Sequence, residues 1–174
     1  MQHVNLSLGL PPIARSDARV LILGSLPGVR SIQAAEYYAH PRNAFWSIMA
    51  VMTGAAGEYE QRCASLMTSG IAVWDVLASS VRPGSLDANI DLDSAEVNDF
   101  AAFLGGHPEI QRICFNGQKA AQIFRNRVLP TLTDSRLDMR TLPSTSPAHA
   151  SMTIEQKLAD WRNELADLVG GNQL

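Results

Sequence analysis

Short runs of apolar residues recur along the chain, and turn-forming residues bound them. Runs of this length, rich in β-branched residues, are typical of strands that are buried on both faces. The predicted strands are Arg19–Leu23, Ile110–Phe115 and Leu137–Leu142, together with the apolar run Ile71–Leu77 up to the loop inside it. Asp75 is the one acid inside such a run, and a loop is expected to begin there.

Segments with helical spacing of apolar residues lie between these strands. The predicted helices are Arg30–Glu36, Asn43–Met52, Tyr59–Thr68, Ala95–Leu104, Gln118–Val128 and Ile154–Val169. Ser94 stands directly before the fourth helix, where serine is a favoured N-cap. Because strands alternate with helices, the pattern predicts an α/β fold of three layers, α/β/α, around a short and mainly parallel sheet.

Composition limits the size and the setting of the molecule. The 174 residues, 46% of them apolar, fit one globular domain over residues 1–174. Residues 1–17, with Pro11 and Pro12, are expected to form an extended N-terminal arm packed on the surface. No stretch is long enough to span a bilayer and no signal peptide is visible, so a cytoplasmic monomer with no obligatory protein partner is expected.

Charge and cysteine usage restrict the possible ligands. A net charge of -3 speaks against a nucleic-acid partner, because nonspecific affinity for DNA depends on neutralising phosphates, although a local basic face remains possible. Cys63 and Cys114 lie far apart without metal-ligand spacing, and both are interpreted as reduced core thiols. The sequence therefore predicts no metal site and no cofactor.

A glycine-rich turn, Gly24-Ser-Leu-Pro-Gly28, follows the first strand. Its two glycines let a ligand approach the backbone closely, and open α/β sheets bind ligands at the carboxyl ends of their strands. The next segment, Tyr37–Trp46, is unusually aromatic, and planar rings suit a planar ligand such as a nucleobase. Because Asn116-Gly117 and Pro143–Pro147 also follow strands, the three loops are expected to form one site.

These segments resemble the motifs of the uracil-DNA glycosylase superfamily. The likeness rests on Gly24–Gly28, on Pro41-Arg-Asn-Ala-Phe-Trp46, on Phe115-Asn-Gly117 and on Leu142-Pro-Ser-Thr-Ser-Pro-Ala148. It is greatest to the hypoxanthine-DNA (deoxyinosine) glycosylase branch, near the mismatch-specific uracil and thymine-DNA glycosylases. The resemblance implies a monofunctional DNA glycosylase of base excision repair, which hydrolyses the N-glycosidic bond of hypoxanthine or uracil. It implies DNA containing deaminated bases as the partner.

The resemblance assigns the catalytic role to Asn43. The catalytic asparagine of the first family motif falls on Leu26, which can neither hold nor activate water. In the hypoxanthine branch the asparagine of the second element takes this role, and here it is Asn43. An amide oxygen can aim a water molecule at C1′ of an oxocarbenium-like sugar. Considered without the resemblance, Asn43 is a typical helix N-cap.

Other matched residues are expected to bind the base. They are Gly24, Ser25, Leu26, Gly28, Tyr38 and Asn116. By the resemblance, the Tyr38 ring stacks on the flipped base, and the amide of Asn116 either reads a base edge or fixes the phosphate. The backbone N–H groups of Ser25 and Leu26 could stabilise negative charge on the departing base. Each feature also has a plain structural interpretation, as a surface tyrosine or an ordinary turn.

The last motif and the arginine near the first are expected to contact DNA. The residues are Arg42, Ser144, Thr145 and Ser146. Hydroxyl and amide groups of such a loop can bond phosphates, and the loop could wedge into the space that the base leaves. Leu142 stands where uracil enzymes of the first family have a histidine. Because a buried acid needs partners, Asp75 either fixes its loop or is functional, and the first interpretation is preferred.

Two other functions fit parts of the sequence. A serine acyl-hydrolase could use Ser25, but the chain lacks the Gly-x-Ser-x-Gly elbow and an evident Asp/His pair. A nucleotide or single-stranded DNA binding module without catalysis is the second alternative, and Leu26 at the usual catalytic position favours it. Release of free base from deaminated oligonucleotides separates this module from a glycosylase.

Overall fold

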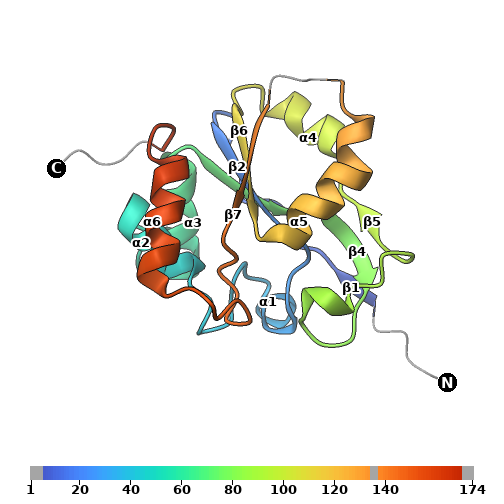
Figure 1. Cartoon of the computed structure of the whole chain (residues 1–174). Helices are drawn as coiled ribbons and strands as arrows, with labels where there is room; N and C mark the ends of the chain where they lie inside the picture. The colour runs from blue at the N-terminus through green and yellow to red at the C-terminus, as the bar shows by residue number, and fades with distance from the viewer. Residues whose placement is uncertain (1–5, 134–136, 170–174) are drawn as a thin grey trace.

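A four-stranded parallel sheet forms the centre of the molecule (Figure 1). The computed structural model describes residues 6–133 and 137–169. The strands lie in the order β3 (Ile71–Asp75), β2 (Val20–Gly24), β6 (Arg112–Asn116) and β7 (Asp138–Leu142), and every pair is parallel. The predicted strands are confirmed to within a residue or two at their ends. Their carboxyl ends lie at one edge of the sheet, which positions the loops that follow them.

Helices cover both faces of this sheet, as predicted (Figure 1). One face carries α2 (Phe45–Thr53), α3 (Tyr59–Thr68) and α6 (Ile154–Leu165). The other face carries α4 (Phe100–Gly106) and α5 (Gln118–Ile123), which continues into a π-helical turn, η2 (Phe124–Val128), and a 3-10 turn, η3 (Leu129–Thr131). A short helix, α1 (Val29–Ala34), follows the turn after β2. This arrangement is the expected three-layer α/β/α fold.

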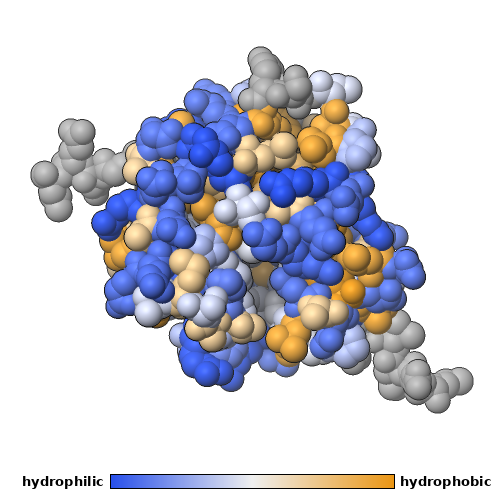
Figure 2. All heavy atoms as spheres, viewed as in Figure 1, coloured by the Kyte–Doolittle hydropathy of each residue, from blue (hydrophilic) through white to orange (hydrophobic). Residues whose placement is uncertain are grey.

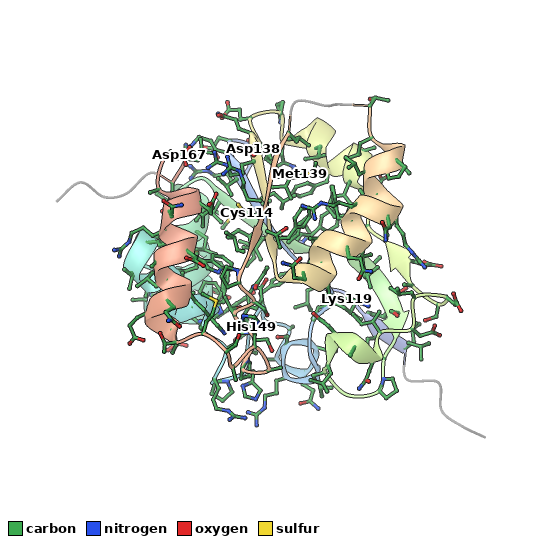
Figure 3. The ribbon with its side chains drawn as sticks, viewed as in Figure 1. Cys114, Lys119, Asp138, Met139, His149 and Asp167 are labelled. Atoms are coloured by element: carbon green, nitrogen blue, oxygen red, sulfur yellow. The ribbon has the colours of Figure 1, made fainter. Side chains whose placement is uncertain are left out.

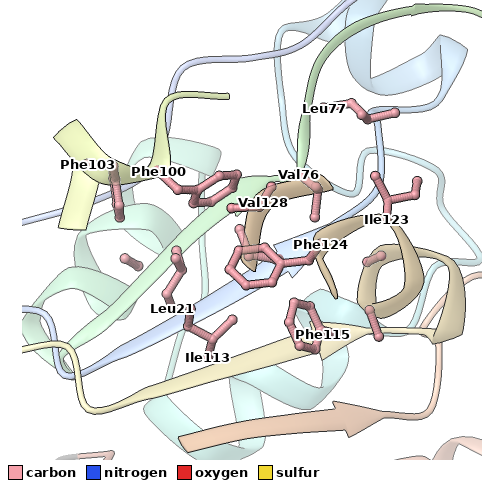
Figure 4. Close-up of a cluster of buried hydrophobic side chains, with 14 of the residues drawn as sticks. Leu21, Val76, Leu77, Phe100, Phe103, Ile113, Phe115, Ile123, Phe124 and Val128 are labelled. Atoms are coloured by element: carbon pink, nitrogen blue, oxygen red, sulfur yellow. The ribbon is translucent and has the colours of Figure 1, made fainter. Parts of the chain in front are cut away.

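Alternate residues of β2 face two separate cores. Val20 and Ile22 belong to the cluster under α2, α3 and α6, whereas Leu21 and Leu23 belong to the cluster under α4 and α5. The second cluster contains Phe100, Phe115 and Phe124 (Figure 4), with the Phe124 ring 5.2 Å from Phe100 and 5.1 Å from Phe115 between centroids. Complete burial of such a side chain contributes about 1.5–3 kcal/mol. The apolar strand pattern therefore follows from burial on both faces.

A second, antiparallel sheet was not predicted. It has the order β1-β4-β5, with β1 (Leu6–Leu8), β4 (Leu77–Val81) and β5 (Glu96–Val97). Strand β1 comes from the predicted N-terminal arm, and Ile13 of the same segment forms a bridge with Val73. The arm therefore extends the structure by strand pairing. Its residues 1–5 lie outside the described part of the chain.

The helix expected over residues 95–104 begins later than predicted. It begins at Phe100, because the Asp99 carboxylate accepts the Ala102 N–H at 3.0 Å and caps it there. Ser94 has another role, since its hydroxyl accepts the Val81 N–H at 2.9 Å and supports β4. The last helix likewise ends at Leu165, short of the predicted end.

Candidate active site

The loops at the carboxyl ends of the parallel strands surround a pocket of about 630 Å³. Every residue predicted to bind the base, the DNA or the catalytic water lines it: Gly24, Ser25, Leu26, Gly28, Tyr38, Arg42, Asn43, Asn116, Ser144, Thr145 and Ser146. His149 also lines the pocket, and Figure 3 shows it at the end of the sheet opposite Asp138 and Asp167. The predicted convergence of three loops is therefore present in the fold.

Two side chains of the segment that follows β4 hold the glycine-rich turn in place. The buried Arg82 guanidinium donates to the backbone carbonyls of Leu26, at 3.2 Å, and of Pro27. The Ser25 hydroxyl donates to the Asp87 carboxylate at 2.6 Å. Carbonyl and N–H groups of a trans peptide point in opposite directions, so the Gly28 N–H is directed away from Arg82.

The turn consequently offers unpaired donors. The backbone N–H groups of Ser25, Leu26 and Gly28 have no hydrogen-bond acceptor within residues 6–133 and 137–169. These three residues line the pocket. Backbone N–H groups that are free in a pocket can bind a carbonyl oxygen or an anion. The sequence-based expectation for Ser25 and Leu26 is compatible with this geometry and stays a prediction.

Asp75 ends β3 and lines the pocket, and it is buried as predicted, but the preferred interpretation of its side chain as fixing the loop is wrong. It is only 4% exposed, yet its carboxyl accepts no hydrogen bond from any described residue, and Oδ2 is fully buried. It therefore does not fix its loop through the side chain. Burial raises the pKa of Asp75 to about 7, with the charge of Asp87 adding to the effect and that of Arg82 opposing it. Such a group is a functional-site candidate.

Tyr38 lies beside Asp75 at the floor of the pocket. Its backbone has a φ of 55°, a strained left-handed conformation for a tyrosine, and its ring stacks on Phe45 with centroids 4.1 Å apart. The hydroxyl is buried and without a partner in the described chain. A Cβ added to Gly24 would lie 2.5 Å from Asp75 Oδ1 and 3.2 Å from the Tyr38 hydroxyl oxygen. Gly24 is therefore required for space. Stacking of Tyr38 on a base stays a prediction.

Asn43 lies one residue before the N-cap of α2, Ala44, and lines the pocket. Its Oδ1 accepts the N–H of Phe45, the first residue of α2, at 3.0 Å. An amide oxygen has two lone pairs, so Oδ1 can accept a second bond from water. The N-cap interpretation is therefore displaced by one residue, because the N-cap is Ala44 and the Asn43 side chain closes the turn that leads into α2. The catalytic interpretation stays a prediction that this hydrogen bond does not exclude.

Asn116 and Thr145 bind each other, which corrects one expectation for this loop. The Asn116 amide donates to the Thr145 hydroxyl, and its oxygen accepts the Thr145 N–H, both at 2.9 Å. Thr145 is 1% exposed, so its side chain cannot reach a DNA phosphate as predicted. The Asn116 amide uses its oxygen and one N–H to hold the loop, so only its second N–H could bind a base edge. This role of Asn116 stays a prediction.

The remaining loop residues are accessible. Ser144 and Ser146 are partly exposed, and their hydroxyls accept the N–H groups of Ser146 and Ala148 at 3.2 Å. Each hydroxyl keeps a proton to donate. Arg42 is exposed at the pocket. A role of these three residues in DNA binding stays a prediction.

No cluster of three or more potential metal-ligating side chains occurs in the described chain, and none of its helices is long and apolar enough to cross a membrane. The surface in view is mostly hydrophilic, and its apolar side chains lie in small separate groups (Figure 2). This face therefore presents no broad apolar patch of the kind that marks a large protein interface.

Comparisons with known proteins identify the family. Residues 11–168 match the family model of the uracil DNA glycosylase superfamily. The chain is 32% identical over 156 residues to the "Hypoxanthine DNA glycosylase" of Methanosarcina acetivorans, a match covering 88% of this chain and 94% of that protein. It is 34% identical over 117 residues to the protein of the same name from Methanosarcina barkeri, covering 66% and 73%.

A solved structure agrees with these matches. The solution NMR structure of a Methanosarcina acetivorans protein, provisionally described as a uracil DNA glycosylase, superimposes with a TM-score of 0.74 at 30% identity. The alignment covers 91% of this chain and 98% of that one. Because the family match extends over residues 11–168, this protein belongs to the uracil DNA glycosylase superfamily, and the family expected from its motifs is confirmed.

Proposed function

We propose that this protein is a monofunctional DNA glycosylase that hydrolyses the N-glycosidic bond of deaminated bases, hypoxanthine or uracil, in base excision repair. One structural observation carries the proposal: a pocket of about 630 Å³, with room for a nucleobase, joins free backbone N–H donors to buried polar side chains. Family membership and the names of the two archaeal relatives support the same activity.

The pocket residues supply a route for hydrolysis. The target nucleotide leaves the base stack and its base enters the pocket, where the Tyr38 ring offers a stacking surface. N–H groups of the turn at Ser25, Leu26 and Gly28 bind the base carbonyl and stabilise the negative charge that develops as the base departs. The C1′–N bond breaks and its electron pair leaves with the base. Asn43 orients the water whose oxygen then bonds to C1′, and the proton that this water loses neutralises the departed base.

The outer rim of the pocket holds the DNA. Arg42, Ser144 and Ser146 bind phosphates, and these contacts fix position without reading sequence. The protein works as a cytoplasmic monomer without a cofactor or an obligatory protein partner. Sedimentation velocity of the free protein and of its DNA complex tests the one-to-one stoichiometry.

Oligonucleotides that each contain one altered base test the function. Hypoxanthine, uracil, xanthine and mismatched thymine are compared in single-stranded and double-stranded DNA, and both free base and alkali-labile abasic sites are measured. We expect release of hypoxanthine or uracil, with strand breaks only after alkali. Binding of these oligonucleotides without any base release would contradict the proposal. It would favour a non-catalytic binding module, the alternative that Leu26 in the first motif suggests.

A further inference from the structure

Lys157 is a buried cation that the protein leaves almost without a partner. The residue is 4% exposed, and its Nζ makes a single hydrogen bond in the described chain, to the backbone carbonyl of Ser146 at 3.4 Å. It forms no ion pair with a carboxylate of residues 6–133 or 137–169. An ammonium has three N–H donors, so two of them have no acceptor among these residues. A buried charge without a counter-charge points to a ligand of opposite sign.

The charges near Lys157 agree with this lack of a partner. Burial lowers the pKa of its ammonium, and no neighbouring carboxylate raises that pKa again. Arg112, which begins β6 at the other end of the sheet, shows the contrast, because its hydrogen bonds to Asp167 and Asp138 raise its pKa above the usual range. The fold therefore neutralises Arg112 internally and leaves the charge of Lys157 for an anion from outside.

The pattern of α6 places Lys157 on the core-facing side of the helix. Lys157, Trp161 and Leu165 follow one another at intervals of four residues, and they are the buried residues of α6. An apolar side chain would suit such a position. Lysine can pack its methylene stem against the core and carry its ammonium beyond it. Here the ammonium reaches the loop after β7.

The loop that receives this ammonium is the one expected to contact DNA. We call residues 143–149 the serine loop. Helix α6 binds two of its carbonyls, since the Trp161 indole N–H donates to that of Pro143 at 2.9 Å and Lys157 donates to that of Ser146. Ser144 and Ser146 line the pocket, and their hydroxyls keep protons to donate. Lys157 therefore contacts a residue whose hydroxyl is proposed to bind a phosphate.

We propose that Lys157 is a positioning residue of the DNA interface, whose ammonium supplies the positive charge for a DNA phosphate that the serine loop binds. The inference rests on the proposed glycosylase function and extends it to the way in which DNA is held. The ligand is a phosphodiester group of the nucleic acid backbone. Serine hydroxyls donate hydrogen bonds but carry no charge, so they release no counterions. A charge behind them acts through protein of low dielectric constant, where its field is stronger than in water.

Replacement of Lys157 by methionine and by arginine tests the proposal. Methionine keeps an apolar stem without the charge, and the Ser146 carbonyl keeps its hydrogen bond from the His149 N–H at 3.0 Å. Binding is measured by fluorescence anisotropy, across a salt series, on duplex DNA that carries a tetrahydrofuran abasic-site analogue. Lys157→Met should bind about tenfold more weakly at low salt, and its slope of log K against log salt should fall by about 1. Lys157→Arg should keep the parent slope.

Stability separates this role from a purely structural one. An apolar side chain in place of an unpaired buried charge removes the cost of burying that charge, so Lys157→Met should unfold at the same urea concentration as the parent or a higher one. Single-turnover excision of hypoxanthine by Lys157→Met should need more protein for half-saturation, while its maximal rate stays within about threefold of the parent rate. A less stable Lys157→Met with the parent salt slope would show that the lysine only holds the loop, and would overturn the proposal.

Arg162→Met is the matched control on the same helix. Arg162 is exposed and lies outside the pocket, and its replacement changes the net charge equally. This variant should keep the affinity and the salt slope of the parent. An equal fall of the slope in Arg162→Met and Lys157→Met would mean that net charge alone causes the effect, and the local role of Lys157 would be overturned.

The outcomes distinguish this inference from the function on which it rests, because the binding assay does not depend on base release. A parent-like salt slope in Lys157→Met would overturn the role of its charge while the glycosylase activity stands. If the parent binds this DNA with the expected dependence on Lys157 but releases no base, the proposed function fails and the role of Lys157 in DNA binding stands. Failure of the parent to bind DNA at all would overturn both.

Discussion

At the scale of single residues, Asn43 is the position at which structure and proposed chemistry coincide. Its Oδ1 is engaged by the Phe45 N–H, so the amide is held in one orientation while it lines the pocket. A fixed amide is what water positioning requires. Asn43→Ala should therefore lower single-turnover base excision by about two orders of magnitude or more, whereas DNA binding in a filter or fluorescence assay should persist.

Asn43→Asp is the matched control for this prediction. Aspartate caps a helix as well as asparagine does, so the variant should unfold at the same urea concentration as the parent. It also adds a charge to the pocket and should slow excision. If Asn43 were only a cap, Asn43→Ala would cost about 1 kcal/mol of stability and retain the parent rate, and that result would end the catalytic assignment.

Sequence patterns located most residues of the site but not their environments. The resemblance placed Asn43 and Tyr38 at the pocket because both lie in contiguous motifs. The burial of Asp75 was predicted, but its lack of hydrogen-bond partners was not, because that depends on how β3, the turn after β2 and the segment after β4 meet in space. Thr145 was expected to contact DNA because the sequence does not show its two hydrogen bonds with Asn116, which hold the threonine inside the loop.

At the scale of elements, the segment after β4 organises the turn after β2. Arg82 binds two backbone carbonyls of the turn, which orients the peptide groups whose N–H donors line the pocket. Arg82→Lys keeps the positive charge but loses the planar, forked set of donors. We expect this variant to excise bases at least about tenfold more slowly. The Leu77 amide proton, which is bonded to the Ser25 carbonyl of the turn at 3.0 Å, should exchange faster in hydrogen exchange.

A conservative change elsewhere provides the comparison for Arg82. Arg15 is exposed and pairs with Asp17 near the N-terminus, so Arg15→Lys should leave excision and amide exchange unchanged. Parent-like excision and exchange in Arg82→Lys would mean that the turn keeps its shape without the guanidinium. In that case the role of Arg82 would be limited to stability.

The secondary structure was predictable wherever local signals agreed. Helix α3 has the predicted bounds, since Gly57 and Gly70, both with positive φ, stand on either side of it. The small sheet was missed because β4 contains two serines and a register shift near Leu77. Both obscure the alternation of apolar and polar residues that marks a strand. Its partner β1 is only three residues long and depends on pairing with β4 for its form.

At the scale of the whole molecule, DNA has to be bound by a protein with a net charge of -3. Binding therefore depends on a few local cations, and Arg42 is an exposed one at the pocket. Arg42→Ala should weaken DNA binding and reduce the slope of log K against log salt by about 1, because one fewer counterion is released. Fluorescence anisotropy across a salt series measures this slope.

A remote arginine tests whether this effect is local. Arg162 is exposed on α6 away from the pocket, and Arg162→Ala changes the net charge equally. Its salt slope should match that of the parent. Equal slopes for Arg42→Ala and the parent would show that Arg42 makes no contact with a DNA phosphate.

The raised pKa of Asp75 also couples the stability of the whole fold to pH. The carboxyl has an ordinary pKa of 3.8, and burial in the folded protein raises it to about 7. Between these values the folded protein holds a proton that the unfolded chain has lost, so the free energy of unfolding decreases as the pH rises. The stabilising contribution of this proton is complete below the unfolded-state pKa of 3.8, and it is lost as the pH rises through the folded-state pKa of about 7.

Other carboxyls act in a different pH range, which makes the effect of Asp75 measurable. Hydrogen bonds from Arg140 and Arg112 lower the pKa values of Asp138 and Asp167, so their stabilising effect is lost only in more acidic solution, below the window of Asp75. Asp75→Asn cannot titrate. Urea unfolding from about pH 4.5 to about pH 8 should therefore show this variant gaining stability relative to the parent, by up to about 3 kcal/mol across the range. A difference between the two proteins that stays constant over this range would mean that Asp75 is ionised in the folded protein throughout and that burial does not raise its pKa.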